Sequence, residues 1–188
     1  MKILIVSGFL GAGKTTFIKR LARNVDQRFA ILENEYGAAG IDGARLGQNR
    51  QGTQKNVWEM TEQCICCIGK KDFAASVLTI ANVVDPEYLI VEPTGVGSLA
   101  RIIENLRQIE YERIQLLSPV TIVDVYSYRR YMAEYPELYQ DQIRSADTII
   151  VSKTEACQAE EKQRIQKFLQ EINSQAKIIT DYASTMTR

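Results

Sequence analysis

Residues 8–15 read GFLGAGKT, which is the pattern G-x-x-x-x-G-K-T of a phosphate-binding loop. An apolar run at 3–6 precedes the loop, and an amphipathic segment at 16–22 follows it. Glycines let successive backbone N–H groups point at a phosphate, and a following helix adds the positive end of its dipole. The sequence therefore predicts a triphosphate site formed by Gly11, Ala12, Gly13, Lys14, Thr15 and Thr16.

Two side chains of this loop and one acid further along have predicted catalytic or metal-binding roles. Lys14 is expected to reach the β- and γ-phosphates, and the Thr15 hydroxyl is expected to ligate Mg²⁺. Glu92 follows the apolar run 89–91 and begins the sequence EPTG, so it is a second predicted Mg²⁺ ligand. Gly95, three positions later, could turn its N–H toward the γ-phosphate. Lys14 and Glu92 are thus the candidate catalytic residues, acting by positioning and charge neutralisation.

A candidate base-binding motif, SKTE at 152–155, follows the apolar run 149–151. Guanine is commonly bound by Asn-Lys-x-Asp, where the carboxylate accepts two hydrogen bonds and the lysine stem lies along the base. Here Lys153 is retained, Glu155 supplies the carboxylate, and Ser152 replaces the asparagine. The three residues are predicted to bind nucleotide, with GTP preferred because adenine lacks the two matching donors.

Three thiols crowd together at Cys64, Cys66 and Cys67. Thiolates suit soft or borderline metal ions, although such cysteines can also be small apolar residues of a buried strand or turn. Glu33 and Glu35, at the end of the apolar run 29–32, could serve a metal ion or a water molecule. The chain has no histidine, so any transition metal must be held by sulfur and carboxylate.

Composition narrows the class of protein further. The 188 residues carry 23 basic and 23 acidic side chains, which gives no electrostatic case for binding nucleic acid or an anionic membrane. The sequence has no apolar stretch long enough for a transmembrane helix and no signal peptide. We therefore expect a cytoplasmic protein with reduced thiols.

Short apolar runs alternate with helical patterns along the chain. The runs lie at 3–6, 29–32, 88–91, 120–123, 148–151 and 177–179, and the later helical patterns at 69–84, 98–109, 136–146 and 158–174. This alternation predicts an α/β fold of three layers, α/β/α, with a mostly parallel sheet. The glycine-rich residues 36–56 interrupt the pattern and are predicted to form a functional loop near the nucleotide.

The ordered motifs GFLGAGKTT, ILENEYG, CICC, VEPTG and SKTE, with DQI at 141–143, resemble the CobW-like branch of the metal-insertion GTPases. That superfamily includes the urease and hydrogenase nickel-maturation proteins. The resemblance covers essentially the whole chain. It implies one P-loop GTPase domain over 1–188, without the C-terminal domain that most members have.

The resemblance also implies an activity: slow, Mg²⁺-dependent hydrolysis of GTP that gates binding or delivery of Zn²⁺, Co²⁺ or Ni²⁺ to a client metalloprotein or corrinoid protein. By this resemblance Cys64, Cys66, Cys67 and Glu33 form the metal site, although Ala38 replaces a glutamate that the family usually has. A homodimer is a candidate assembly, and neither nucleic acid nor membrane is an expected partner. The alternative is a GTP-dependent regulatory module with structural cysteines. A small-molecule kinase would leave SKTE unexplained.

Overall fold

The computed structural model describes residues 1–24, 27–33, 57–61 and 70–181, and within them eight strands form one sheet. The strand order is β3-β2-β4-β1-β6-β7-β8, with β5 paired to β1, and every pair is parallel. The strands are β1 Lys2–Ser7, β2 Phe29–Glu33, β3 Val57–Thr61, β4 Tyr88–Glu92, β5 Gln115–Leu116, β6 Val120–Asp124, β7 Thr148–Ser152 and β8 Lys177–Ile179. All these strands therefore direct their carboxyl ends to the same edge, where ligands of such sheets bind.

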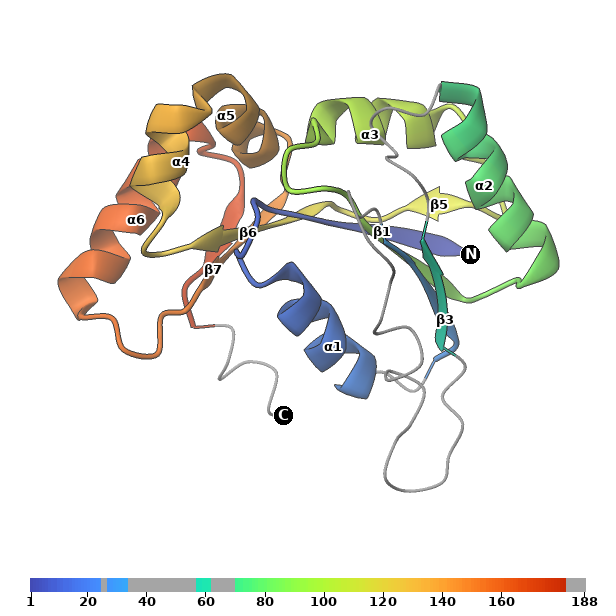
Figure 1. Cartoon of the computed structure of the whole chain (residues 1–188), viewed down its shortest axis with the longest axis horizontal. Coiled ribbons are helices and arrows are strands. Elements are labelled where there is room, and N and C mark those ends of the chain that lie inside the picture. Colours follow the sequence, from blue (N-terminus) through green and yellow to red (C-terminus); the bar gives the residue numbers. More distant parts are fainter. Residues whose placement is uncertain (25–26, 34–56, 62–69, 182–188) are drawn as a thin grey trace.

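Helices cover the two faces of the sheet unequally (Figure 1). They are α1 Lys14–Asn24, α2 Lys70–Val83, α3 Leu99–Arg107, α4 Tyr128–Glu134, α5 Pro136–Arg144 and α6 Ala159–Ile172. Within the described residues α1 alone packs on one face, and the other five helices contribute to the core on the opposite face. None of the described helices has the length and apolar character required to cross a membrane.

Side-chain alternation in β1 explains how one strand serves both layers. Ile3 and Ile5 lie in the larger core beneath α2 to α6, whereas Val6 packs in the smaller core with Phe17 and Ile18 of α1. These five side chains are each 0 to 4% exposed. Burial on both faces accounts for the continuous apolar runs in the sequence.

The predicted three-layer α/β fold is confirmed, and so are the four later helices, each slightly shorter than expected. Three elements were missed: strands β3 and β5, and helix α4. Helix α4 buries Tyr128, with Tyr131 half-buried and two exposed arginines between them, so its sequence has no aliphatic stripe of the kind that marks a helix. The loop predicted at 36–56 lies outside the described residues.

Candidate nucleotide-binding site

The phosphate loop joins the carboxyl end of β1 to the first turn of α1. Gly11 and Gly13 have φ of +72° and +101°, a backbone region that other residues rarely adopt. The loop is closed by hydrogen bonds from the N–H of Ala12 to the carbonyl of Phe9 (3.1 Å) and from the N–H of Phe17 to the carbonyl of Gly13 (2.9 Å). This geometry points the first N–H groups of α1 at a possible anion.

A cavity of about 570 Å³ opens above this loop, at the carboxyl edge of the sheet. Residues from four segments line it: the phosphate loop, the end of β2, the loop after β4 and the residue after β7. Of the predicted site residues, those that line it are Gly11, Gly13, Lys14, Thr15, Thr16, Glu33, Glu92 and Lys153. Strand order and parallel register thus bring motifs separated by more than half of the chain into one hollow.

Lys14 is buried beside the phosphate loop, with its side-chain ammonium directed back over the loop. The Nζ atom lies 3.4 Å from the carbonyl oxygen of Phe9. Burial lowers the pKa of Lys14, and the nearby Glu92 carboxylate opposes this shift. An anionic phosphate in the cavity would stabilise the charged ammonium further, which fits the role predicted for Lys14.

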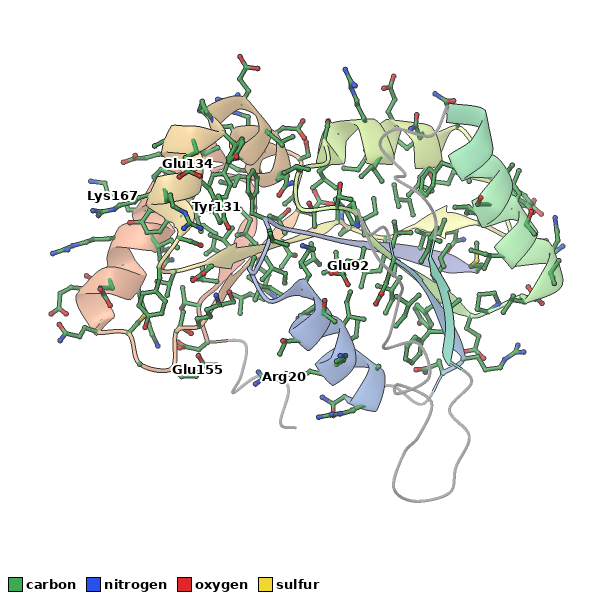
Figure 2. All side chains as sticks on the ribbon, in the orientation of Figure 1. Arg20, Glu92, Tyr131, Glu134, Glu155 and Lys167 are labelled. Atoms are coloured by element: carbon green, nitrogen blue, oxygen red, sulfur yellow. The ribbon has the colours of Figure 1, made fainter. Side chains whose placement is uncertain are left out.

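Thr15 and Glu92 meet across the cavity floor, where the Thr15 hydroxyl donates to Oε1 of Glu92 at 3.2 Å. In Figure 2, Glu92 lies between the sheet and α1. Hydroxyl and carboxylate oxygens are the hard ligands that Mg²⁺ prefers, so this pair fits the predicted Mg²⁺ site. Glu33 is the register partner of Glu92 on the neighbouring strand and also lines the cavity, which adds a second carboxylate to the same wall.

Ser152 lies behind the phosphate loop. Its side chain is buried, and its hydroxyl donates to the carbonyl of Ala12 at 2.6 Å. Ala12 is buried as well, and neither residue lines the cavity. This hydrogen bond therefore links the phosphate loop to the end of β7. Since Ser152 does not line the cavity, it can affect a bound nucleotide only through that loop.

Lys153 is held by a carboxylate that the sequence motifs did not single out as a site residue. Its φ of +60° turns the chain at the end of β7, and its Nζ lies 2.8 Å from Oδ2 of Asp124 at the end of β6. Asp124 also accepts from the N–H of Tyr126 and the hydroxyl of Ser127, both at 2.9 Å. Burial alone would raise the pKa of Asp124, but the hydrogen bonds from Lys153, Tyr126 and Ser127 outweigh it and lower the pKa.

Asp124 could have been found from its place directly after the apolar run 120–123, and the strand register sets it opposite Ser152 in the β6–β7 pair. Strained backbone at a residue such as Lys153 is typical of functional sites. The contact with Asp124 holds the Lys153 side chain at the wall of the cavity.

Glu155 and the three cysteines are the remaining predicted site residues. Glu155 is exposed and does not line the cavity, and Figure 2 shows it beyond the end of β7, apart from Glu92. Cys64, Cys66 and Cys67 lie outside the described residues, and the described part of the chain has no group of three or more histidine, cysteine or acidic residues that could hold a metal ion. The last described residue before the cysteines, Thr61, pairs in register with Glu33.

A parallel sheet with a phosphate loop after its first strand, an acid opposite that loop and a lysine after β7 defines a P-loop nucleotide-binding protein. Comparison with known proteins gives the family. The model of the CobW/HypB/UreG nucleotide-binding domain matches residues 2–180, so the chain belongs to this family.

Named relatives agree with this assignment. The zinc chaperone YeiR of Escherichia coli is 30% identical over 178 residues, covering 93% of this chain and 53% of YeiR. The zinc chaperone CobW of Pseudomonas aeruginosa is 27% identical over 194 residues, covering 88% and 52% of the two proteins. The chain spans about half the length of these curated relatives.

Solved structures share the fold. Zn(II)-bound YjiA GTPase from Escherichia coli superposes with a TM-score of 0.70 at 22% identity, covering 96% of this chain and 57% of the other. The hydrogenase maturation factor HypB from Archaeoglobus fulgidus gives a TM-score of 0.64 at 18% identity, covering 95% and 80%. At these identities the likeness shows the fold alone.

Proposed function

We propose that this chain is the nucleotide-binding domain of a slow GTP hydrolase that couples its nucleotide state to the binding or delivery of a transition metal. The observation that carries the proposal is the contact of Thr15 with Glu92 beside the buried Lys14, in a cavity that also includes Glu33. The residues proposed to bind phosphate and the carboxylate proposed to bind the transition metal thus line one cavity. Relatives named as zinc chaperones make Zn²⁺ the first candidate, with Co²⁺ and Ni²⁺ as alternatives.

Hydrolysis would depend on positioning and charge rather than on a covalent intermediate. The loop N–H groups and Lys14 bind the phosphates, and the Thr15 hydroxyl with the Glu92 carboxylate would hold Mg²⁺. Mg²⁺ held there would supply positive charge that neutralises the phosphates. Glu33 and Glu92 offer carboxylates that can orient a water molecule against the γ-phosphate.

Guanine selection is assigned to the end of β7. Lys153, held by Asp124, offers its stem to the face of the base, and Glu155 two residues later is proposed to accept from the guanine edge. Competition of labelled GTP by unlabelled GTP and ATP tests this assignment. Displacement by ATP as effective as that by GTP would refute it.

The metal cargo is assigned to Glu33 together with Cys64, Cys66 and Cys67. Strand pairing supports this assignment, because Thr61, three positions before Cys64, is the register partner of Glu33, and Glu33 lines the nucleotide cavity. A γ-phosphate at that wall would change the surroundings of the same carboxylate. A client metalloprotein or corrinoid protein is the proposed recipient, and a homodimer the proposed assembly.

The decisive experiment is a Zn²⁺ titration of the protein loaded either with a non-hydrolysable GTP analogue or with GDP. We expect the affinities to differ by about tenfold, a coupling of the usual allosteric size. Replacing Cys66 with serine should abolish the difference. Cys157→Ser is the matched control, because this half-buried thiol lies far along the chain from the cluster. Equal Zn²⁺ affinities in the two nucleotide states would refute the coupling.

A further inference from the structure

Gln142 in α5 is a buried amide for which the proposed mechanism has no role. Its side chain is 1% exposed, and its Nε2 donates to the carbonyl oxygens of Gly95 at 3.2 Å and Gly97 at 3.0 Å. Both carbonyls belong to the loop after β4, and Gly95 lines the nucleotide cavity. One side chain therefore ties α5 to the loop that is expected to face the γ-phosphate.

The other end of this amide is unsatisfied. Among the described residues the buried Oε1 of Gln142 has no hydrogen-bond partner. Reversing the amide would turn this oxygen toward two carbonyl oxygens, so the two donated bonds fix its orientation. A buried acceptor without a donor is unfavourable, and the two bonds that Nε2 donates to loop carbonyls offset this cost. Packing alone does not account for a glutamine at this position.

The preceding residue of α5 holds the other end of the same loop. Oδ2 of Asp141 accepts from the N–H of Leu99 at 2.8 Å and from the N–H of Ala100 at 3.4 Å, the first two residues of α3. A carboxylate at a helix N-terminus satisfies donors that have no partner within the helix. Helix α5 thus fixes the loop both at Gly95, beside the cavity, and where α3 begins.

Helix α5 is itself anchored to its neighbours. The buried hydroxyl of Thr121 in β6 donates to the carbonyl of Gln142 at 2.9 Å. Nδ2 of Asn173, just after α6, donates to the carbonyls of Ile143 and Ala146, each at 2.9 Å. Because the sheet and α6 hold this helix, it is a fixed support against which the loop is positioned.

Helices α4 and α5 also contact the phosphate loop. The ring of Phe9 lies 4.7 Å from that of Tyr131 and 5.0 Å from that of Tyr139, measured between centroids. The Tyr131 hydroxyl donates to the carbonyl of Leu10 at 2.9 Å, and Figure 2 shows Tyr131 on the side of α4 that faces the sheet. The same helix pair therefore supports both loops that would enclose a γ-phosphate.

We propose that Gln142 is a positioning residue for GTP hydrolysis: it sets the Gly95 loop at the correct distance from the phosphate loop, with Asp141 supporting the same loop. This inference rests on the proposed GTP hydrolysis. It predicts that the amide matters when a γ-phosphate is present and not when GDP is bound, because GDP lacks the phosphate that the Gly95 loop is expected to face.

The test replaces Gln142 with methionine, which keeps the volume and removes the two donated bonds. Gln140→Met is the matched control, since the same change is made on the same helix, where the amide has only a 3.9 Å contact to Sδ of Met132. Purified proteins are compared for kcat and KM with GTP, for affinity toward GDP and a non-hydrolysable GTP analogue, and for thermal unfolding. We expect about a tenfold loss of kcat and of the preference for the analogue over GDP, with GDP affinity unchanged.

The outcomes separate cleanly. The inference is overturned if kcat and the preference for the analogue over GDP both stay at the wild-type level. It is also overturned if GDP affinity and thermal stability fall in parallel, because this indicates a general structural role. If the unmodified protein hydrolyses no GTP, the proposed function fails, and the analogue-to-GDP ratio still decides the role of Gln142. If Gln142→Met does not fold, Asp141→Ala and Asp141→Asn replace it. The alanine variant should lose about tenfold in kcat and the asparagine variant should not, because it keeps an acceptor for Leu99. Equal rates overturn the proposal.

Discussion

Replacing Gly95 with alanine should separate the Gly95 loop from the phosphate loop. A Cβ at this glycine would lie 2.5 Å from the backbone nitrogen of Leu10 and 3.0 Å from the carbonyl carbon of Phe9. Both are backbone atoms of a tight loop, so neither can rotate away. Restoring ordinary contact requires the loops to move apart by about 1 Å, and a displacement of this size at a reacting centre costs about a hundredfold in rate. We therefore expect kcat/KM for GTP to fall about a hundredfold, equivalent to about 2.7 kcal/mol of transition-state stabilisation.

The assay is phosphate release from GTP under multiple-turnover conditions, with GDP affinity measured in parallel. Gly97→Ala is the matched control two residues away, since its Cβ would come no closer than 3.3 Å to the Thr94 carbonyl oxygen. We expect that variant to stay within about threefold of the unmodified protein, because a shift of a few tenths of an ångström relieves the contact. If Gly95→Ala hydrolyses GTP as fast as Gly97→Ala, the close approach of the two loops has no catalytic meaning.

Three other changes test separate parts of the site. Ser152→Ala removes the hydroxyl bound to the Ala12 carbonyl, so the free energy of unfolding in urea should fall by about 1 kcal/mol; an unchanged midpoint contradicts the fastening role. Asp124 has a lowered pKa when folded, so its stabilising pairing with Lys153 is complete above the ordinary pKa and is lost as pH falls through the lowered one. In Asp124→Asn the free energy of unfolding should therefore fall less steeply below about pH 4 than in the unmodified protein. Acid-denaturation curves that run parallel for the two proteins would contradict this. Thr15→Ala should raise the Mg²⁺ concentration for half-maximal hydrolysis about tenfold while Thr15→Ser does not; equal Mg²⁺ requirements would exclude Thr15 as a ligand.

The parts of the site that were predictable from sequence are those carried by short local motifs. Lys14 and Thr15 belong to the loop motif that follows β1, and Glu92 ends β4; a parallel sheet brings such positions to one edge whatever the details of packing. The cavity confirms their proximity. Site residues that belong to a short local motif can be predicted from the sequence without knowing the register of the strands.

The supporting contacts were not predictable in this way. The partnership of Asp124 with Lys153 depends on β6 and β7 being neighbours in register. Ser152 was expected at the nucleotide, but burial turns its hydroxyl to the back of the loop. Gln142 belongs to a helix that was predicted correctly, yet its two bonds to the Gly95 loop depend on how that helix crosses the sheet edge. Residues that position other residues form no short sequence motif, so the sequence alone does not predict their role.

The position of β1 has a consequence for how the protein is made. This strand is synthesised before the other strands of the sheet but occupies its middle, and its partners β4 and β6 end only at Glu92 and Asp124. At ordinary rates of translation, roughly 5 to 20 residues per second, the phosphate loop must wait several seconds for the strands that flank it. During that time the apolar β1 is an unpaired strand of a nascent chain, open to chaperones and to aggregation. Bound nucleotide cannot assist folding until the loop after β4 has left the ribosome.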